Sequence, residues 1–524
     1  MVTKLAASAL TLFVLFLLTG WTTKVTPPQS STSAELSGHV RYLASEELMG
    51  RAVGTAGIDL ARNYIGEQFA KYGLLPGGDN GTYFQAVEAA TGLKLKDASE
   101  VAVANARLAP DREWTALGFS ASARVEGEMV FVGYGITATD YGYDDYAGMD
   151  VKGKIVVVLR YEPPPKDGGS PFRKHPQYSR YAELRTKAQT ARGHGAAGMI
   201  LVDLNSAEES EKGLLSLART SSTSDAGIVS VQVSHRSLER ALAGTGLSLR
   251  ARKEKIDRDE KPASIPLGWK ASLGIQIERI TAKADNVIGI LPGFESRAKD
   301  EHIVIGAHYD HIGLGHYGTR DTSAEGRIHH GADDNASGTA VLLWLAKELS
   351  RQPRRLPVAV IFVAFTGEEL GLYGSRQYAT RPALPLLSAK AMINLDMVGR
   401  LRNNRLMVAG AGTAKEFREI LNHAELGLSL DVSPGVGRSD HVSFYNLNVP
   451  VLHFYTGVHE DYHRPTDTWE KLNFEGMEKV GRFVLHTATR VAGMSGPLTF
   501  SRVPPNAGRR EELIPTSPPR APNP

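Results

Sequence analysis

Histidine and carboxylate residues stand in this 524-residue sequence where apolar runs end. They are His308 and Asp310 after the run 303–307, Asp333 and Asp334 before a helical pattern, Glu368 and Glu369 after the run 358–365, Asp396 after the run 392–395, and Asp461 and His463 nearer the C-terminus. Because the sequence has no cysteine, thiolate nucleophiles, disulfides and cysteine-built zinc sites are excluded. Imidazole and carboxylate ligands without thiolates indicate an open, reactive metal centre rather than a closed structural one.

Each of these groups has an ordinary structural explanation when it is taken alone. Two glutamates at a helix start can simply face the positive end of the helix dipole. The run 333–335 can cap a helix, and a single histidine after a strand is usually structural. Their joint occurrence at successive strand ends favours a metallohydrolase instead.

The residue types also favour a centre with two metal ions. Two nearby dications repel each other, so one carboxylate has to bridge them while others neutralise the remaining charge. Metals in such a site polarise a carbonyl group and lower the pKa of a shared water, and a separate carboxylate then takes the proton of that water. The neighbours Glu368 and Glu369 suit this division, because adjacent side chains point in different directions and one can bind metal while the other stays free.

The elements that must position these residues alternate between short strands and helices from residue 275 onward. We expect strands at 287–291, 303–307, 358–365, 392–395 and 449–454, and helices at 336–349, 370–378, 415–424 and 474–492. This alternation predicts an α/β fold with a central, mostly parallel sheet flanked by helices. Ligands of such folds bind beyond the carboxyl ends of the strands, which is where the histidines and carboxylates stand.

Composition divides the remainder of the chain into further segments. Residues 126–262 form a β-rich unit with a helix or two, and a charged, proline-containing stretch closes it. This unit separates residues 32–125, which begin with helical patterns, from residues 263–495, which carry the chemistry. Residues 496–524 are rich in proline and poor in apolar residues, which predicts a disordered tail.

The N-terminus predicts export. Lys4 followed by the apolar run 5–18 is typical of a signal peptide, and the run is too short to span a bilayer comfortably. Trp21 stands where a lipoprotein would need a cysteine. We therefore expect residues 1–31 to be a signal peptide and linker, and the mature chain to be periplasmic or extracellular without a membrane anchor. A net charge of +3 gives no electrostatic footprint for nucleic acid.

The motifs at the strand ends resemble those of the M28 family of dizinc aminopeptidases, its secreted or periplasmic members especially. The runs 153–158 and 195–198 resemble the protease-associated (PA) domain that is often inserted in that family. The resemblance covers residues 36–492 and includes the segments 49–51 and 54–57. It implies a zinc-exopeptidase fold with a PA domain at 126–262, two zinc ions per chain and peptide substrates.

The resemblance also implies a role for each motif residue. His308 and Asp396 are expected to bind one metal, Glu369 and His463 the other, and Asp334 both, with Asp310 orienting His308 and Glu368 activating the metal-bridging water. Asp333 is the weaker candidate for the bridge, because the family pattern places the bridge directly before Asn335. Tyr462 is a candidate hydrogen-bond donor to the oxyanion. Arg438 and Asp440 lie in a segment that resembles a substrate pocket, although a turn and helix cap would explain it too.

Three functions remain open at this point. An aminopeptidase that hydrolyses N-terminal peptide bonds is the leading interpretation. A carboxypeptidase or amide hydrolase could use the same metals, since Arg438 could bind a substrate carboxylate. A non-catalytic binding protein of the same fold would be expected to lack a ligand, whereas this sequence keeps all of them. The side-chain preference, the native metal and the oligomeric state are not determined by the sequence.

Overall fold

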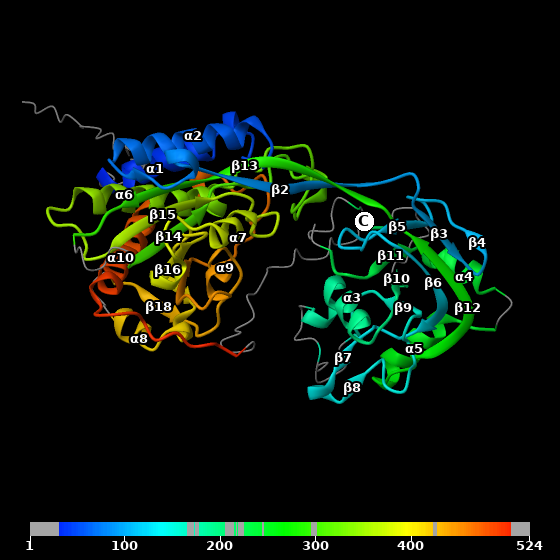
Figure 1. Cartoon of the computed structure of the whole chain (residues 1–524). Helices are drawn as coiled ribbons and strands as arrows, with labels where there is room; N and C mark the ends of the chain where they lie inside the picture. The colour runs from blue at the N-terminus through cyan, green and yellow to red at the C-terminus, as the bar shows by residue number, and fades with distance from the viewer. Residues whose placement is uncertain are drawn as a thin grey trace, which may run out of the picture.

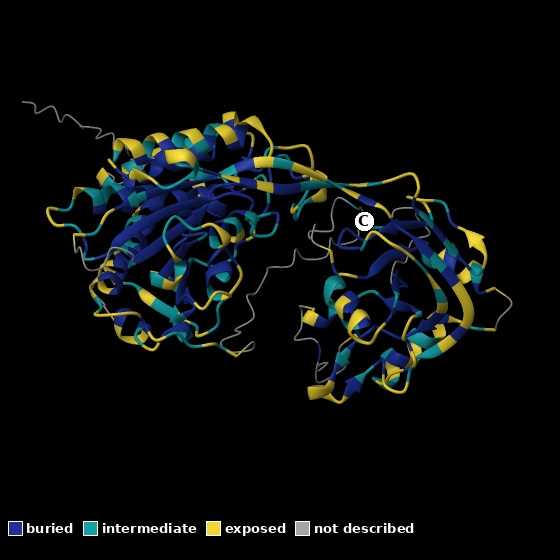
Figure 2. Ribbon diagram, in the orientation of Figure 1, coloured by how far each residue is buried: buried dark blue, intermediate teal, exposed yellow. Residues whose placement is uncertain are grey.

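The computed structural model describes residues 31–504 apart from 165–171, 173–177, 205–213, 216, 218–224, 244–245, 295–300 and 423–426. Two lobes, each built around its own sheet, are joined by a long ribbon of two strands (Figure 1). In both lobes the strands of the sheet are largely buried, and exposed residues lie mainly on helices and loops (Figure 2). Residues 1–30, nearly all of the predicted signal segment, lie outside the described part of the chain.

The first lobe contains a nine-stranded mixed sheet, sheet A. Its order is β1 (Leu75–Pro76), β13 (Ile277–Leu291), β15 (Ala359–Phe365), β14 (His302–His308), β16 (Ala389–Leu395), β19 (Val451–Tyr455), β17 (Arg405–Ala409) and β18 (Ser429–Val432), with β2 (Phe84–Leu95) also paired to β13. The central strands β15, β14, β16 and β19 are parallel, and antiparallel pairs flank them. These four strands are runs of apolar residues, as expected where both faces of a parallel sheet are buried.

Helices cover both faces of sheet A. The first face carries α1 (Ser31–Leu43), α2 (Ala56–Lys71), α6 (Gly338–Arg351) and α10 (Phe474–Gly493), with the short α8 (Phe417–Ile420) beside α10, and the second face carries α7 (Tyr373–Thr380) and α9 (His441–Tyr445). Because successive residues of a strand point to opposite faces, Ile303 and Ile305 of β14 pack with the first group and Val304 packs with the second. The predicted α/β class, with a mostly parallel sheet flanked by helices, is confirmed.

The second lobe contains an eight-stranded sheet, sheet B. Its order is β4 (Ala106–Arg107), β3 (Glu100–Val103), β12 (Ile265–Gly274), β6 (Arg124–Phe131), β9 (Ile155–Leu159), β10 (Gly198–Val202), β11 (Val229–Val233) and β5 (Trp114–Ala116). The strands β6, β9, β10 and β11 are parallel to one another. This lobe also contains α3 (Leu184–Gly193), α4 (His235–Ala241), α5 (Leu249–Asp259) and the short pair β7 (Thr137–Ala138) and β8 (Tyr143–Asp144).

Sheet B extends beyond the predicted unit 126–262 at both ends. The strands β3, β4 and β5 precede that range, and β12 follows it. They are integral to the sheet, because β12 pairs with β3 on one side and with β6 on the other, and β5 pairs with β11 at the far edge. These strands are short or partly exposed, so composition alone does not separate them from their surroundings.

The connection between the lobes is the antiparallel pair of β2 and β13, whose register runs from Leu95 opposite Ile277 to Phe84 opposite Val287. The sequence predicted only residues 287–291 of β13, the part buried in sheet A. The preceding residues mix exposed and buried positions, because they leave the core and form the ribbon.

Residues beyond the predicted domain boundary at residue 495 still pack against the first lobe. Phe500 forms an isolated β-bridge with Ala414, and the hydroxyl of Thr499 donates to Glu416 at 2.7 Å. The amino group of Lys390 donates to the carbonyl of Gly496 at 2.8 Å. Residues 496–504 therefore belong to the packed lobe, whereas 505–524 lie outside the described residues.

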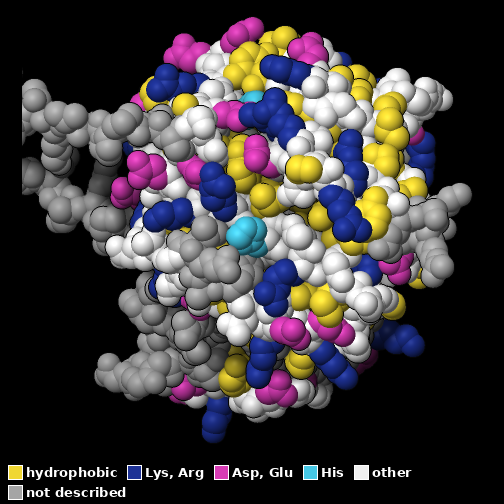
Figure 3. All heavy atoms as spheres, turned by 90° about the vertical axis from the view of Figure 1, so that its left-hand side faces the viewer, with side chains coloured by type: hydrophobic (Ala, Val, Ile, Leu, Met, Phe, Trp, Pro, Cys, Tyr) yellow, Lys and Arg dark blue, Asp and Glu magenta, His cyan; other side chains and the backbone are white. Residues whose placement is uncertain are grey.

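The surface agrees with the nearly balanced charge of the sequence. On the face of the first lobe that Figure 3 shows, basic and acidic side chains are interspersed rather than gathered into one basic patch. None of the helices described here has the length and apolar character that crossing a membrane requires.

Candidate metal centre

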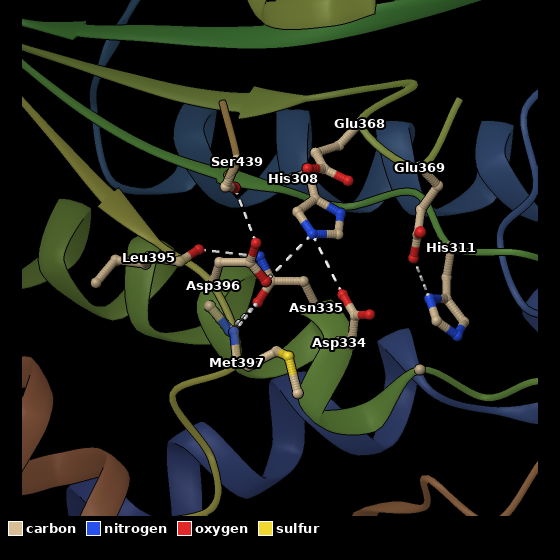
Figure 4. Close-up of polar contacts among 12 residues, drawn as sticks. His308, His311, Asp334, Asn335, Glu368, Glu369, Leu395, Asp396, Met397 and Ser439 are labelled. Atoms are coloured by element: carbon tan, nitrogen blue, oxygen red, sulfur yellow. Dashed lines mark hydrogen bonds and ion pairs between the residues drawn. The ribbon is translucent and has the colours of Figure 1, made fainter. Parts of the chain in front are cut away.

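The predicted metal ligands meet at one edge of sheet A. His308 is the last residue of β14, Glu368 and Glu369 follow β15, and Asp396 follows β16. These strands are parallel neighbours, so their carboxyl ends share an edge. Asp334 reaches the same edge from the loop before α6, and Figure 4 shows its carboxylate directed toward the ring of His308. His463 comes from the loop after β19.

The side chains form two groups that share Asp334. His308 Nε2 lies 3.3 Å from Asp334 Oδ1 and 3.3 Å from Asp396 Oδ1. His463 Nε2 lies 3.1 Å from Asp334 Oδ2 and 3.0 Å from Glu369 Oε2. Asp334 thus presents one oxygen to each group, which is the arrangement that a carboxylate bridging two metals needs.

The chemistry of this donor set fits divalent metal ions. The side chains of Asp334 and Glu369 are buried and Glu368 is half-buried. Within the described residues no lysine or arginine forms an ion pair with them or with Asp396. Burying several carboxylates together is costly unless a cation compensates them. The buried Nε2 of His463 lies close to two carboxylate oxygens yet forms no well-aligned hydrogen bond with either, as expected for a nitrogen that serves as a metal ligand.

The pKa values of the adjacent Glu368 and Glu369 are shifted in opposite directions. Burial raises the pKa of Glu368 well above its usual value, and the nearby carboxylates of Asp440, Asp396 and Glu369 add to that shift. Burial acts the same way on Glu369, but the charge of His463 outweighs it and lowers the pKa of Glu369 to about 2. Glu369 is therefore held as an anion, whereas Glu368 readily accepts a proton.

Asp310 anchors both glutamates. The backbone N–H of Glu368 donates to Asp310 Oδ1 at 3.1 Å, and that of Glu369 donates to Asp310 Oδ2 at 3.4 Å. His308 Nδ1 lies 3.1 Å from the backbone carbonyl of Asp310 and 3.8 Å from its carboxylate. The contact of Asp310 with His308 thus runs mainly through its backbone, and its side chain positions the loop that carries Glu368 and Glu369.

The remaining predicted site residues lie in different settings. Tyr462 is half-buried, and its ring stacks on His463 with centroids 3.9 Å apart. Asp440 is fully buried, and its charge acts on Glu368. Arg438 is 83% exposed and pairs with Glu183 of the second lobe at 3.3 Å. The structure therefore brings Tyr462 and Asp440 to the cluster but does not show Arg438 in it.

Sequence reasoning missed His311, Ser439 and the role of Asn335. His311 is fully buried, its Nδ1 lies 2.7 Å from Glu369 Oε1, and it forms a possible metal-holding group with Asp334 and Glu369. The Ser439 hydroxyl donates to Asp396 Oδ2 at 2.8 Å. Asn335 donates to the carbonyl of Leu395 at 2.9 Å, which ties the Asp334 loop to Asp396 (Figure 4). The one sequence signal for His311 was its place three residues after His308.

Known proteins resemble both lobes. Residues 286–488 match the model of peptidase family M28, and residues 125–240 match that of the PA domain. Aminopeptidase YwaD of Bacillus subtilis is 30% identical over 214 residues, which is 38% of this chain and 43% of that protein. A probable leucine aminopeptidase of Arthroderma otae is 26% identical over 230 residues, covering 40% of this chain and 59% of that protein. The chain thus spans about half the length of these curated relatives.

Solved structures share the fold over most of the chain. An aminopeptidase from Aneurinibacillus sp. strain AM-1 aligns with a TM-score of 0.54 and 24% identity over 90% of this chain and 96% of that one. BSAP, a zinc aminopeptidase from Bacillus subtilis, aligns with a TM-score of 0.50 and 21% identity over 88% of this chain and 94% of that one. At these identities the likeness establishes the fold. Residues 286–488 are thus a region of the peptidase family M28 type, and residues 125–240 are a PA domain.

Proposed function

We propose that this protein is a dizinc metallo-aminopeptidase that hydrolyses N-terminal peptide bonds. The observation that carries the proposal is the pair of ligand groups sharing Asp334, with Glu368 beside them. His308 and Asp396 would hold one zinc ion, Glu369 and His463 the other, and Asp334 both. The relatives named above as aminopeptidases support the same activity.

The residues divide the work of hydrolysis. Zinc ions bound at this centre would polarise the scissile carbonyl and lower the pKa of a water molecule. Glu368 then takes a proton from that water on its carboxylate and delivers it to the departing amine, as its readiness to accept a proton allows. Tyr462, stacked on His463, is the candidate donor to the developing oxyanion.

The charges around the centre favour a substrate with a free amine over one recognised by a free carboxylate. The half-buried Glu368 and the buried Asp440 are carboxyl groups that a protonated amine would complement. Arg438, the residue that could bind a substrate carboxylate, is exposed and paired with Glu183 instead. This contrast supports aminopeptidase activity rather than carboxypeptidase activity. The complete set of ligands supports an enzyme rather than a non-catalytic binding protein.

The cellular setting is part of the proposal. Lys4 and the apolar run 5–18 support export to the periplasm or the extracellular space. Peptides in that space are then the substrates.

The test compares substrates that differ only at the amine. The full-length mature chain should hydrolyse aminoacyl chromogenic substrates and leave their N-acetylated counterparts intact, and elemental analysis should find two zinc ions per chain. Preferential cleavage of the N-blocked substrates would reject the aminopeptidase assignment and favour the amide-hydrolase alternative.

A further inference from the structure

The loop that carries Asp334, the proposed bridging ligand, is fixed by hydrogen bonds from its backbone to Asp467. The backbone N–H groups of Asp333 and Asp334 donate to Asp467 Oδ2 at 2.9 and 3.1 Å. The backbone N–H of Ala332 donates to the carbonyl of Asp467 at 3.1 Å. Three successive amides of the loop therefore point at one fully buried residue.

Asp467 is itself fixed by Arg400. The guanidinium of Arg400 donates to Asp467 Oδ1 at 3.1 Å and, from the same nitrogen, to Asp461 Oδ2 at 3.1 Å. Asp461 also accepts from Lys471 at 2.5 Å. Asp467 thus uses one oxygen for the loop amides and the other for the guanidinium, whereas Asp461 contacts the guanidinium without touching the loop amides.

The opposite side of the same loop is held by a cation. Arg51 is fully buried and donates to the carbonyls of His330 and Gly331 at 2.9 and 3.0 Å, and to that of Tyr309 at 2.8 Å. An anion at the amides and a cation at the carbonyls both complement the dipoles of the loop backbone. Together they leave the peptide groups next to Asp334 little freedom to turn.

Asp467 also lies in the segment that carries His463. Its backbone N–H donates to Arg464 at 3.1 Å, so His463 and Asp467 stand at either end of one tight turn. The bridging ligand and a ligand of the second zinc ion come from segments more than a hundred residues apart in sequence. Asp467 joins those two segments through the backbone amides of Asp333 and Asp334, and His459 Nε2, 3.1 Å from Asp333 Oδ2, links the same segments through a side chain.

We infer that Asp467 is a positioning residue for the dizinc centre, because it fixes the bridging Asp334 relative to His463. The inference rests on the dizinc function proposed above. Asp334 gives one oxygen to each ligand group, so a shift of its loop weakens both zinc sites together. Loss of Glu369 or Asp396, by contrast, removes a ligand from one site only. Residues that orient metal ligands typically change metal affinity 10- to 100-fold when they are altered.

The test is zinc affinity in a set of matched variants. Asp467→Asn keeps the size of the side chain but replaces one oxygen by a donor NH2 group. That group must face either the loop amides or Arg400, and both are donors. Asp461→Asn is the control, because it removes the same charge beside Arg400 and leaves the loop amides paired. Arg400→Met combined with Asp467→Asn removes the opposing guanidinium, so the Asn oxygen can turn to the amides.

Each metal-free variant of the full chain is titrated with zinc against a chromophoric chelator, and its thermal unfolding is recorded without metal. We expect Asp467→Asn to weaken both zinc sites at least tenfold, Asp461→Asn to stay within about twofold of the wild type, and the double variant to recover part of the affinity. The inference fails if Asp467→Asn binds both ions like the wild type. It also fails if Asp461→Asn loses as much affinity at equal metal-free stability. A wild-type chain that binds no zinc would instead refute the proposed dizinc function itself.

Discussion

Both lobes contain parallel, fully buried strands, yet among the described residues only the first lobe ends its strands in a cluster of carboxylates that no lysine or arginine neutralises. In sheet B, Arg160 follows β9 and Asp203 follows the neighbouring β10, and the two form an ion pair at 3.0 Å. In sheet A, His308 ends β14 and Asp396 follows β16, and no lysine or arginine of the described chain neutralises that carboxylate. An acidic residue at a strand end therefore marks a site only when the protein leaves its charge for a ligand to neutralise.

Metal removal should separate the two lobes most strongly. Chelation should abolish hydrolysis, and zinc or cobalt should restore it, because in the proposed mechanism the ligand groups at the edge of sheet A would hold the ions that activate water. The unfolding temperature of the first lobe should fall when the metal is lost. Binding at 100 times the dissociation constant stabilises a folded state by about 2.7 kcal/mol. Calorimetry with and without chelator tests this, and activity that persists in protein shown to be metal-free would contradict it.

Exchanging one strand-end carboxylate in each lobe tests the comparison directly. Asp396→Asn should cost the centre one zinc ion and nearly all activity, because the variant lacks the carboxylate that is proposed to bind zinc together with His308. Asp203→Asn should keep both zinc ions and cost about 1 kcal/mol of stability, because a partly exposed ion pair contributes little. Zinc content, rates and urea unfolding are the measurements. Equal zinc loss in both variants would remove the distinction between the sheets.

Excision of the PA lobe should leave the metal centre intact. Leu95 of β2 lies opposite Ile277 of β13, so a two-residue Asn-Gly turn can join them and close a hairpin. The shortened chain should bind two zinc ions and hydrolyse a small aminoacyl substrate, since the predicted ligands all belong to the first lobe. Removal of 126–262 alone should misfold instead, because β3, β5 and β12 would lose partners. A folded excision variant without zinc would show that the second lobe builds the centre.

A smaller effect on the free energy of unfolding is expected at low pH, because His39 in the first lobe binds a proton less readily in the folded chain than in the unfolded one. Burial lowers the pKa of His39 from 6.5 to about 4, and its Nδ1 lies 2.7 Å from the Tyr64 hydroxyl. Between these values the unfolded chain binds the proton and the folded chain does not, so stability falls as the pH drops from about 6.5 to about 4. His39→Gln should reduce this slope by up to about 1.4 kcal/mol per pH unit in urea unfolding of the metal-free protein. An unchanged slope would show that His39 is not held neutral.

The central strands of sheet A were predictable because they are continuous apolar runs, and the strand ends could be located from them. The ribbon of β2 and β13 was harder to predict, because the exposed and buried residues in the first half of β13 do not alternate with a regular period. The short strands β3 and β5 depend on partners far away in sequence, so no local pattern marks them. The PA lobe was therefore recognised from its strands β9 and β10, but its edges were not.

Within the centre, sequence could nominate residues that stand at strand ends but not those that act through tertiary contacts. The choice of Asp334 over Asp333 agrees with the geometry, because Asp333 points away to His459 at 3.1 Å. Apart from the place of His311 three residues after His308, His311 and Asp467 carry no local signal that distinguishes them from surface or capping residues. Their contacts with Glu369 and with the Asp334 loop exist only once segments far apart in sequence have met.

The measurement that tests the central claim most directly is the kinetics and zinc content of Glu368→Gln beside Glu369→Gln. In the proposed mechanism Glu368 transfers the proton and Glu369 binds metal. The nearly isosteric variant of Glu368 should therefore keep both zinc ions and a similar KM but lose 10²- to 10⁴-fold in kcat. Glu369 supplies a ligand, so its variant should bind zinc more weakly at one site and recover partly when zinc is added. Zinc loss in Glu368→Gln together with full zinc in Glu369→Gln would reverse the two roles. Two fully active variants would contradict the account of this centre altogether.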